Sequence, residues 1–597
     1  MNPPTKNLNP RDQIPNPSPA NKGGHHRRAS RSRRNRSRTS LLARGEPMIW
    51  VTGGALIVCL AMILGLLALL FTAGTATFWP KSVVRVQTTD GRIFMGEVVR
   101  KSTYESVNTA DMDAAADAGS NHAEEPSSAQ NTRRLIRTGN FRISNTHFDW
   151  VRDTDIKTED RPNDVMLLER VEWGRFYGSP FQFMIDGQIV ADTPDSVFQK
   201  YNEFHDEARY RVREINHLES IVIGGFNHQI EKARLVLRKI ELRTEGKNND
   251  EYLAAQEHFN AVSSEVDKAF KNTQKQIEQL KHENERYQLN FRTAQGDEAT
   301  IKLADIVRAY FPNQLSTIDK MKIYLSRWGE FLADEPREAN SEGGVFPAIF
   351  GTVLMTLIMT LAVVPFGVLA ALYIREYARK GPTISAIRIA INNLAGVPSI
   401  VFGVFGLGFF CYVVGGEIDQ LFFEARLPSP TFGKGGILWA ALTLALLTLP
   451  VVIVATEEAL AAVPGSMREG AYACGASKWQ TIWRIVLPRA LPGIMTGAIL
   501  AMARGAGEVA PLMLVGAVKL APELPFDRFF PYIHPERSFM HLGFHIYDLG
   551  FQSQNSEAAK PMVFTTTILL ILIITALNLS AVMLRTRLRK KFIDQQF

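Results

Sequence analysis

Cysteine is scarce in this sequence and absent from its long polar part. The cysteines among the 597 residues are Cys59, Cys411 and Cys474, and the first two lie within apolar runs. No disulfide framework can therefore hold the polar stretch 80–342 together. The same stretch has no metal-ligand spacing, no nucleophile motif and no phosphate-binding loop. We expect it to be a docking or structural domain rather than an enzyme, without a catalytic or metal site.

The nucleotide-binding signature G-x-x-x-x-G-K-[ST] is also absent from the chain. In that signature a glycine-rich loop and a lysine hold the phosphates of ATP. We therefore expect no ATPase activity and no directly bound cofactor. Any energy taken from ATP must come from a separate subunit.

Charged residues are rare in six long stretches, most of which lie in residues 343–597. A helix needs about 20 apolar residues to cross a bilayer, and each stretch has that length. The first stretch is too long and too far from the N-terminus for an ordinary signal peptide, so we expect it to be retained as an anchor. We predict six transmembrane helices, at Met48–Ala73, Val345–Tyr373, Ile391–Val414, Gly436–Ala455, Leu491–Val515 and Pro561–Met583.

The net charge of +7 comes mostly from an arginine-rich N-terminal tail, residues 1–47. Such a tail can bind nucleic acid or anionic lipid, but beside a membrane span it is more simply an orientation signal, because basic segments stay in the cytoplasm. Alternation of the spans then places the basic segments 375–388, 456–490 and 584–597 in the cytoplasm too. We predict a multi-pass protein of the bacterial inner membrane that contacts lipid and no nucleic acid. Both termini are expected to be cytoplasmic and residues 80–342 periplasmic.

The predicted periplasmic region has the pattern of an α+β domain. Residues 82–99 alternate in polarity around Asp90-Gly91, which indicates a β-hairpin, and short strands are expected through about residue 190. Residues 105–131 have few large apolar groups and are expected to be a flexible loop. Apolar residues then recur at helical spacing from about 196, with a break in that repeat near Gly224-Gly225, and predict one long amphipathic helix; they recur again over 251–287. With the polar turn 245–250 between them, these segments predict a long helical hairpin at about 196–287.

The stretch EGAYACGASKWQTIWRIVLP, residues 469–488, has the signals of a compact helical element between two spans. Ser466 and Glu469, and again Ser477 and Gln480, have the spacing of a capping box. Gly475 is placed to end the first helix in a left-handed conformation. In the second helix we expect one apolar face, and we expect Leu487-Pro488 to end that helix. The face consists of Trp479, Ile482, Trp483 and Val486.

Two interpretations of this element remain open from capping and amphipathicity alone. In the first, the element is a rigid cytoplasmic contact that receives force from a partner. A flexible loop could not transmit the movement of that partner. Alternatively, the element is an interfacial connector whose tryptophans lie at the lipid headgroups.

A resemblance favours the first interpretation. Glu469-Gly470-Ala471, then Gly475, then Ile485 to Pro488 resembles the EAA loop (E-A-A-x3-G-x9-I-x-L-P) of binding-protein-dependent ABC importer permeases, with Gly470 in place of the middle alanine. The resemblance implies a type I, MetI-like permease core of five helices at 343–583 and a coupling loop at 456–490 that inserts into an ATPase subunit. The residues assigned to coupling are Ser466, Glu469, Gly470, Ala471, Gly475, Ala476, Trp479, Ile485, Leu487 and Pro488.

Residues 392–410 and 475–517 resemble the A-type permeases of phosphate-specific (Pst) importers, some of which carry an N-terminal extension. Arg504 and Glu508 match the R-x-x-G-E element that this family uses in phosphate passage. A charge at a helix centre costs on the order of 3 kcal/mol, so an intramembrane pair suggests a functional site. Arginine suits an oxyanion because its planar fork donates two hydrogen bonds. In the alternative interpretation, the pair neutralises itself and only braces the bundle.

The resemblance also implies partners and a mechanism. The implied partners are a C-type permease subunit, two copies of an ATP-binding subunit and a periplasmic phosphate-binding protein. The implied mechanism is alternating access. Glycines such as Gly403, Gly406, Gly408, Gly497, Gly505 and Gly507 would allow the helices to approach closely and move. Two alternatives are a membrane-anchored sensor and a permease for another oxyanion, molybdate or sulfate.

Overall fold

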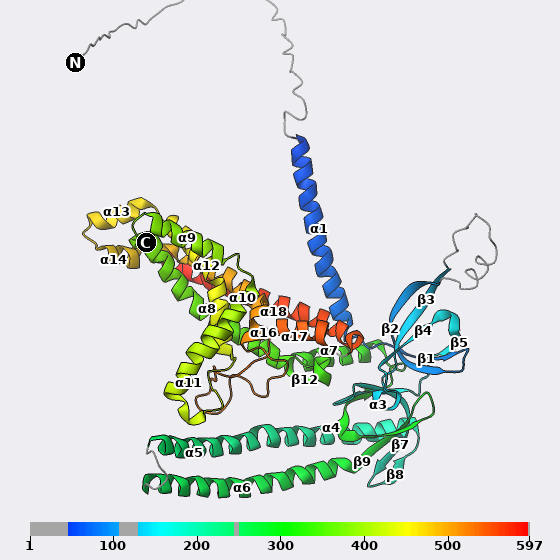
Figure 1. The fold of residues 1–597 in the computed structure, drawn as a ribbon. Helices are drawn as coiled ribbons and strands as arrows, with labels where there is room; N and C mark the ends of the chain where they lie inside the picture. The colour runs from blue at the N-terminus through cyan, green and yellow to red at the C-terminus, as the bar shows by residue number, and fades with distance from the viewer. Residues whose placement is uncertain (1–45, 107–128, 244–249, 554, 595–597) are drawn as a thin grey trace, which may run out of the picture. The chain divides into compact units, whose positions relative to one another are not determined.

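The structure is a computed structural model, and it describes residues 46–106, 129–243, 250–553 and 555–594 (Figure 1). Almost the whole basic tail 1–47, most of the predicted loop 105–131 and nearly all of the turn 245–250 lie outside these residues. The chain divides into two compact units, residues 1–66 and 67–597. In the first unit, the described residues 46–66 form the first part of one apolar helix.

Six helical segments of the described chain are long and apolar enough to cross a membrane, which confirms the predicted number. Several consist of α-helix interrupted by a π-helical turn (η). The segments are α1 (Glu46–Ala76), α8 (Phe346–Leu372) with η5 (Tyr373–Tyr377), α10 (Ser399–Phe405) with η6 (Gly406–Gly415) and α11 (Gly416–Phe422), α12 (Ile437–Ala461), α14 (Lys478–Thr481) with η8 (Ile482–Val486) and α15 (Leu487–Gly507), and α18 (Ser556–Asp594).

The predicted third and fifth spans differ most from the structure, and proline explains one limit of each. The third span begins at Ser399 rather than Ile391, because α9 (Pro382–Leu394) is a separate helix that ends four residues before Pro398. The fifth span ends at Gly507 rather than Val515, four residues before Pro511, and α16 (Ala510–Val515) follows as a short separate helix. A proline ring clashes with the carbonyl four residues earlier in an α-helix, so a helix either bends or ends there.

The most buried of these helices is α12, which packs between α8 and α15. The glycine predictions hold where neighbouring helices touch. A Cβ added at Gly497 would lie 2.7 Å from the Ala455 Cβ of α12, and one added at Gly505 would lie 2.3 Å from the Met359 sulfur of α8. Gly403 and Gly406 are equally tight, whereas a Cβ at Gly408 or Gly507 would meet nothing within 4 Å. Close approach therefore explains only some of these glycines.

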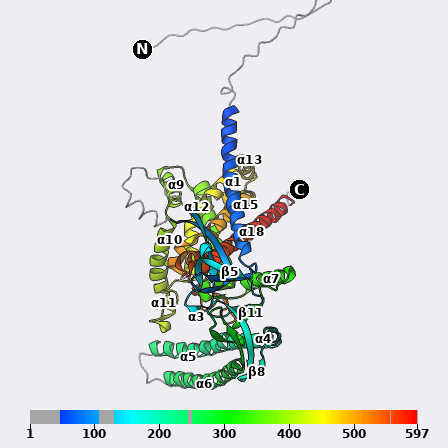
Figure 2. The ribbon, with the colours of Figure 1, turned by 90° about the vertical axis from the view of Figure 1, so that its right-hand side faces the viewer.

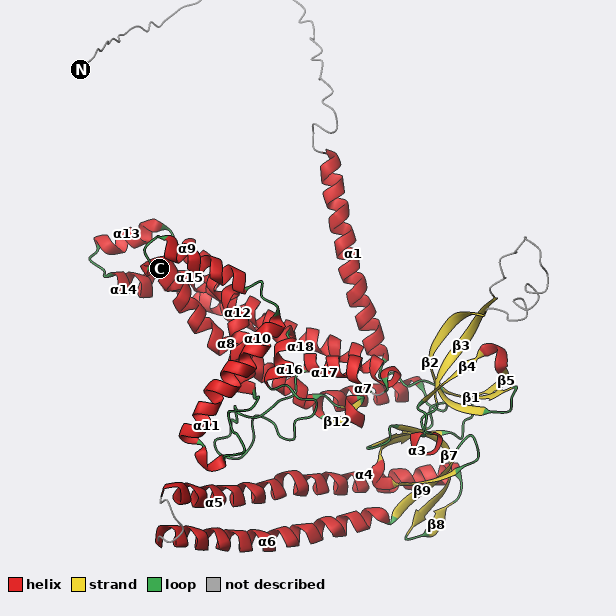
Figure 3. Cartoon of the chain, in the orientation of Figure 1, coloured by secondary structure: helices red, strands yellow, loops and turns green. Residues whose placement is uncertain are grey.

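The polar region contains two large antiparallel sheets (Figure 3), besides the two-stranded pair of β12 (Pro336–Arg337) and β13 (Glu342–Gly343). The first has the order β4-β3-β2-β1-β5, built from β1 (Val83–Thr88), β2 (Ile93–Ser106), β3 (Ala129–Arg137), β4 (Phe148–Arg152) and β5 (Ile156–Asp160). The predicted hairpin joins β1 to β2, and Gly91 has φ +85° in its turn. The second has the order β10-β9-β7-β6-β11, with β8 on β7. Its strands are β6 (Met166–Arg170), β7 (Arg175–Ile185), β8 (Gln188–Ala191), β9 (Tyr287–Arg292), β10 (Glu298–Lys302) and β11 (Ile306–Tyr310).

Two long helical segments connect β8 to β9 and lie side by side in both views (Figures 1 and 2). The first comprises α4 (Pro194–His217), η2 (Leu218–Val222) and α5 (Ile223–Arg243), and the second is α6 (Asp250–Glu285). Thr193 and Ser196 form a capping box at the start of α4. The first segment is one continuous helix, as predicted, and it passes through Gly224-Gly225. It takes a π-helical turn at η2 just before the glycines, and a π-turn keeps the backbone hydrogen-bonded.

The remaining elements are short connections, apart from α7 (Thr317–Ala333), which follows the second sheet and was not predicted from the sequence. They are α3 (Phe141–Ser144), β12 (Pro336–Arg337), β13 (Glu342–Gly343), α13 (Gly465–Ala473), α17 (Leu542–Tyr547), the π-helical η9 (Asp548–Gln552), and the 3-10 turns η1 (Asp153–Asp155), η3 (Leu303–Asp305), η4 (Glu338–Asn340) and η7 (Glu424–Arg426).

Candidate functional site

The predicted coupling element begins with α13, which does not start as expected. Its N-cap is Pro464, and no side chain caps its first turn. The capping box predicted for Ser466 and Glu469 is therefore wrong. The helix starts directly after the extended residue Pro464, so Ser466 already lies inside the first turn and is not at the cap position.

The turn after α13 is built as predicted. Gly475 has φ +80°, a left-handed conformation that suits a residue without a Cβ. Its backbone N–H donates to the Tyr472 carbonyl at 2.9 Å, and the Ala476 N–H donates to the Ala471 carbonyl at 3.0 Å. These two bonds form a Schellman motif, which satisfies the last free carbonyls of α13 and fixes the direction in which the chain leaves it.

The second capping box is confirmed. The Gln480 backbone N–H donates to the Ser477 hydroxyl oxygen at 3.2 Å, and the Ser477 N–H donates to the Gln480 side-chain oxygen at 2.9 Å. The helix that starts here does not end at Leu487-Pro488 as predicted. It runs from Lys478 to Gly507, because Arg484, the residue four positions before Pro488, lies in the wider π-turn η8, which makes room for the proline ring. The element is thus joined without a break to the fifth span.

The predicted apolar face of this helix is divided in two. Ile482 and Val486 are buried against the ends of α8 and α12, in a cluster that includes Leu372 and Leu460. Trp479 and Trp483 remain 58% and 55% exposed, and their rings stack at 5.3 Å. One edge of the helix therefore anchors the element to the bundle, and the other presents two adjacent indole rings outward.

Polar contacts also fix α13 to the bundle. The Arg468 guanidinium donates to the backbone carbonyls of Val463 and Leu460 at the end of α12, and pairs with Glu376 of η5 at 2.9 Å. Lys478 lies over the Tyr377 ring at 4.9 Å. These contacts hold α13 against the second and fourth spans and α14 against the second span.

The residues assigned to coupling differ in accessibility. Ser466, Glu469, Gly470, Gly475 and Trp479 are exposed, whereas Ala476, Ile485, Leu487 and Pro488 are half-buried and Ala471 is buried. The exposed positions lie mainly on α13 and at the start of α14. The motif residues at its end help to pack the element and offer little surface to a partner.

Arg504 and Glu508 form the predicted ion pair, but not at the centre of a continuous helix. The Arg504 Nε lies 3.6 Å from the Glu508 Oε1, and the side chains are 39% and 21% exposed. Arg504 is in the last turn of α15, and Glu508 is the residue at which the backbone becomes extended (ψ 133°) before α16. A cation in the last turn is also favoured by the helix dipole. Pro511 was the sequence signal that could have revealed this break.

The comparisons with known proteins cover this helical part of the chain. Residues 363–590 match the family model described as the binding-protein-dependent transport system inner membrane component. The chain is 41% identical over 175 residues to the phosphate transport system permease protein PstA of Mycobacterium leprae, covering 29% of this chain and 52% of that one. It is 36% identical over 196 residues to PstA of Yersinia pestis, covering 33% and 59% respectively.

This segment is therefore similar to PstA permeases and to the membrane components of binding-protein-dependent transport systems. A probable ABC transporter permease of Bacillus subtilis, YqgH, is 34% identical over 202 residues, which are 33% of this chain and 62% of that one. The chain thus spans between about half and three fifths of the length of these curated relatives.

Solved structures of ABC transporters are also similar. A structure titled as inward-facing conformations of the MetNI methionine transporter aligns with 41% of this chain and 94% of that chain, at 20% identity and a TM-score of 0.29. A bacterial transporter involved in the import of alginate aligns with 44% and 83%, at 18% identity and a TM-score of 0.32.

Proposed function

We propose that this chain is a transmembrane subunit of an ATP-driven importer and that it passes inorganic phosphate into the cytoplasm. The proposal rests chiefly on one observation. A rigid element with a coupling-loop pattern continues without interruption into the helix that ends beside Arg504 and Glu508. The phosphate transport permeases among its relatives support the choice of substrate.

The continuous helix provides the mechanical link. It has 30 residues, from Lys478 to Gly507, and at 1.5 Å per residue it is about 45 Å long. A push on the α13–α14 element would therefore be transmitted along the helix to Arg504. The η8 turn is the point at which this rod can change its bend, because π-turns are common at functional positions in helices.

The partners follow from this mechanism. An ATPase subunit, present in two copies, would contact α13 and the exposed tryptophan pair from the cytoplasm, and a C-type permease subunit would complete the pathway. A phosphate-binding protein would deliver the anion from the periplasm, the side on which residues 80–342 are proposed to lie. The chain itself would carry out no chemical reaction, and closure of the ATPases would switch the permease pair between outward and inward access.

At the site, Arg504 supplies a fixed positive charge to a passing oxyanion. Glu508 holds the guanidinium through the 3.6 Å pair and lies where the helix has ended. Two N–H donors of the guanidinium can bind two phosphate oxygens at once. Selection of phosphate over other anions is assigned mainly to the binding protein, since one arginine cannot distinguish phosphate from sulfate.

The test is uptake of radiolabelled phosphate by the assembled transporter in an Arg504→Gln variant. Loss of a charge-assisted hydrogen-bonded contact should lower uptake roughly 10- to 100-fold. The exchanged pair, Arg504→Glu with Glu508→Arg, separates passage from bracing. The exchanged pair keeps an ion pair of the same spacing. If the anion needs a cation at position 504, phosphate uptake by this variant should be as low as in Arg504→Gln.

Full uptake by the exchanged pair would show that the two charges only brace the bundle. Uptake of molybdate or sulfate in place of phosphate would reject the assigned substrate. Co-purification of the variants with the ATPase subunit controls for assembly.

A further inference from the structure

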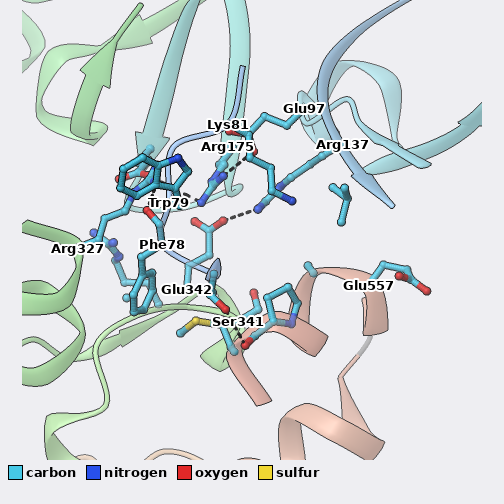
Figure 4. A pocket seen from close by; sticks show the side chains of 18 of the residues that line it. Phe78, Trp79, Lys81, Glu97, Arg137, Arg175, Arg327, Ser341, Glu342 and Glu557 are labelled. Carbon is cyan, nitrogen blue, oxygen red and sulfur yellow. Dashed lines mark hydrogen bonds and ion pairs between the residues drawn. The ribbon is translucent and has the colours of Figure 1, made fainter. Parts of the chain in front are cut away.

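A small pocket of about 100 Å³ lies where the segment after α1 and the start of α18 meet the polar region (Figure 4). Its wall includes Thr77 to Trp79 and Lys81, strands β2, β3 and β7, helix α7, and the first turns of α18. The Thr77 hydroxyl donates to the Pro561 carbonyl at 3.1 Å, and the Thr565 hydroxyl donates to the Gly74 carbonyl at 3.0 Å. The pocket therefore lies beside a direct contact between the ends of two spans.

Most charges in this wall are already paired. Arg175 lies 2.7 Å from Glu97, Arg137 lies 2.5 Å from Glu342, and Arg327 pairs with Glu169. All six side chains line the pocket, and Figure 4 shows the arginines together with Glu97 and Glu342, which come from distant parts of the sequence. Buried ion pairs of this kind persist only when each charge has a partner, because an isolated buried charge is costly.

Three side chains of this wall keep an unused donor or acceptor among the described residues: Lys81, Glu97 through its Oε1, and Arg337 through its Nε. The Lys81 ammonium makes no hydrogen bond or ion pair there, although Glu97 is near enough to act on its charge. Glu97 is only 3% exposed, and its Oε1 has no hydrogen-bond partner. The pocket thus offers an unused cationic donor and an unused, buried carboxylate acceptor on the same wall. A buried polar atom without a partner calls for an explanation.

Desolvation in the pocket lowers the pKa of Lys81. Glu97 opposes this change, and Arg175 and Arg137 add to it. An anion bound beside Lys81 would favour its charged form.

We propose that this pocket binds inorganic phosphate in a protonated form, as a site separate from the transport pathway. Lys81 and the neighbouring guanidinium of Arg137 would donate hydrogen bonds to the phosphate oxygens, and Glu97 Oε1 would accept a hydrogen bond from a phosphate hydroxyl. The ligand must carry both acceptors and a donor, and it must be small. Hydrogen phosphate meets these conditions, and sulfate, of similar shape, has no proton to donate at neutral pH.

This inference rests on the proposed function, which makes phosphate the anion that the chain meets. A bound phosphate would join the segment after α1 to strands β2 and β3 beside the start of α18. Binding should therefore raise the thermal stability of the chain. Trp79, which lines the pocket and is 37% exposed, provides a fluorescence signal close to the ligand.

The experiment measures thermal unfolding and tryptophan fluorescence of the full-length chain in detergent, titrated with sodium phosphate or with sodium sulfate at equal ionic strength. Phosphate should stabilise the protein and sulfate should not. Lys81→Met should raise the phosphate concentration needed for a half-maximal response roughly 10- to 100-fold, as expected for loss of a charged donor. Lys81→Arg should retain most of the response. Lys157→Met, an exposed lysine on β5 that does not line the pocket, is the matched control and should respond as the unaltered chain does.

Glu97→Gln should remove the discrimination, so that sulfate stabilises the variant as well as phosphate does. If that variant does not fold, the lysine variants decide the question alone. An unchanged phosphate response in Lys81→Met, or equal responses of the unaltered chain to phosphate and sulfate, would overturn the proposal.

Arg504→Gln should lose uptake but keep the phosphate response, which separates this site from the transport pathway. Absence of any phosphate response in a chain that still supports uptake would reject this pocket and leave the proposed function intact.

Discussion

The contact between α15 and α12 at Gly497 leads to a quantitative prediction. A Cβ added at Gly497 would lie 2.7 Å from the Ala455 Cβ, about 1 Å closer than carbon atoms normally approach. Gly497→Ala should therefore force the two helices apart, at a cost of about 1–3 kcal/mol. The intrinsic gain from replacing a helical glycine offsets up to about 1 kcal/mol of that cost.

The reciprocal exchange isolates the contact. Ala455→Gly with Gly497→Ala moves one methyl group from α12 to α15, where the next nearest atom of α12 is 3.7 Å away. In a double-mutant cycle the helix propensities cancel, so the coupling energy should be roughly 1–3 kcal/mol in favour of the exchanged pair.

The assay is unfolding of the purified chain by denaturing detergent in mixed micelles. Gly507→Ala is the control on the same helix, because its added Cβ would meet nothing within 4 Å, and it should not destabilise the chain. A coupling energy below about 0.5 kcal/mol would refute the steric argument.

Two further predictions concern helix α13 and the polar region. Gly470→Ala, at a helical position where an added Cβ meets nothing within 4 Å, should raise the stability of the chain by about 0.5–1 kcal/mol in the same detergent titration. A loss of stability would contradict its helical assignment. Glu169→Gln should destabilise the polar region by about 3–5 kcal/mol in thermal melts, because Arg327 and Arg308 lose their buried partner. Burial alone would raise the pKa of Glu169, but the charges of Arg327, Arg308 and Arg175 outweigh it and hold that pKa well below the ordinary 4.5. This stabilisation should therefore be complete above pH 4.5 and decrease as the pH falls, and an unchanged acid transition in Glu169→Gln would contradict the assignment.

Several features of the site could be predicted because their causes are local. The Ser477–Gln480 box and the left-handed Gly475 depend on residues at most five positions apart. The box predicted at Ser466 failed although its spacing was the same, because Pro464 had already set where the helix begins. The same interval can thus mark a cap or an ordinary helical turn, and its neighbours decide which.

The tryptophans illustrate a different kind of failure. Trp479, Ile482, Trp483 and Val486 share one face by helical spacing, yet only the two aliphatic residues are buried. Spacing shows which side chains point in similar directions. The ends of α8 and α12 determine how much of that arc is covered, and those ends are more than 15 residues away in sequence.

The sequence by itself determined the number of membrane helices, the first β-hairpin and the turn of the proposed coupling element. Each depends on the length of an apolar run or on backbone hydrogen bonds within a few residues. Only the tertiary structure decided which glycines touch another helix and where Lys81 and Glu97 meet the charges of β3, β7 and α7. Those contacts join residues up to several hundred positions apart. Short-range patterns contain no information about which distant segments of the chain pack against one another.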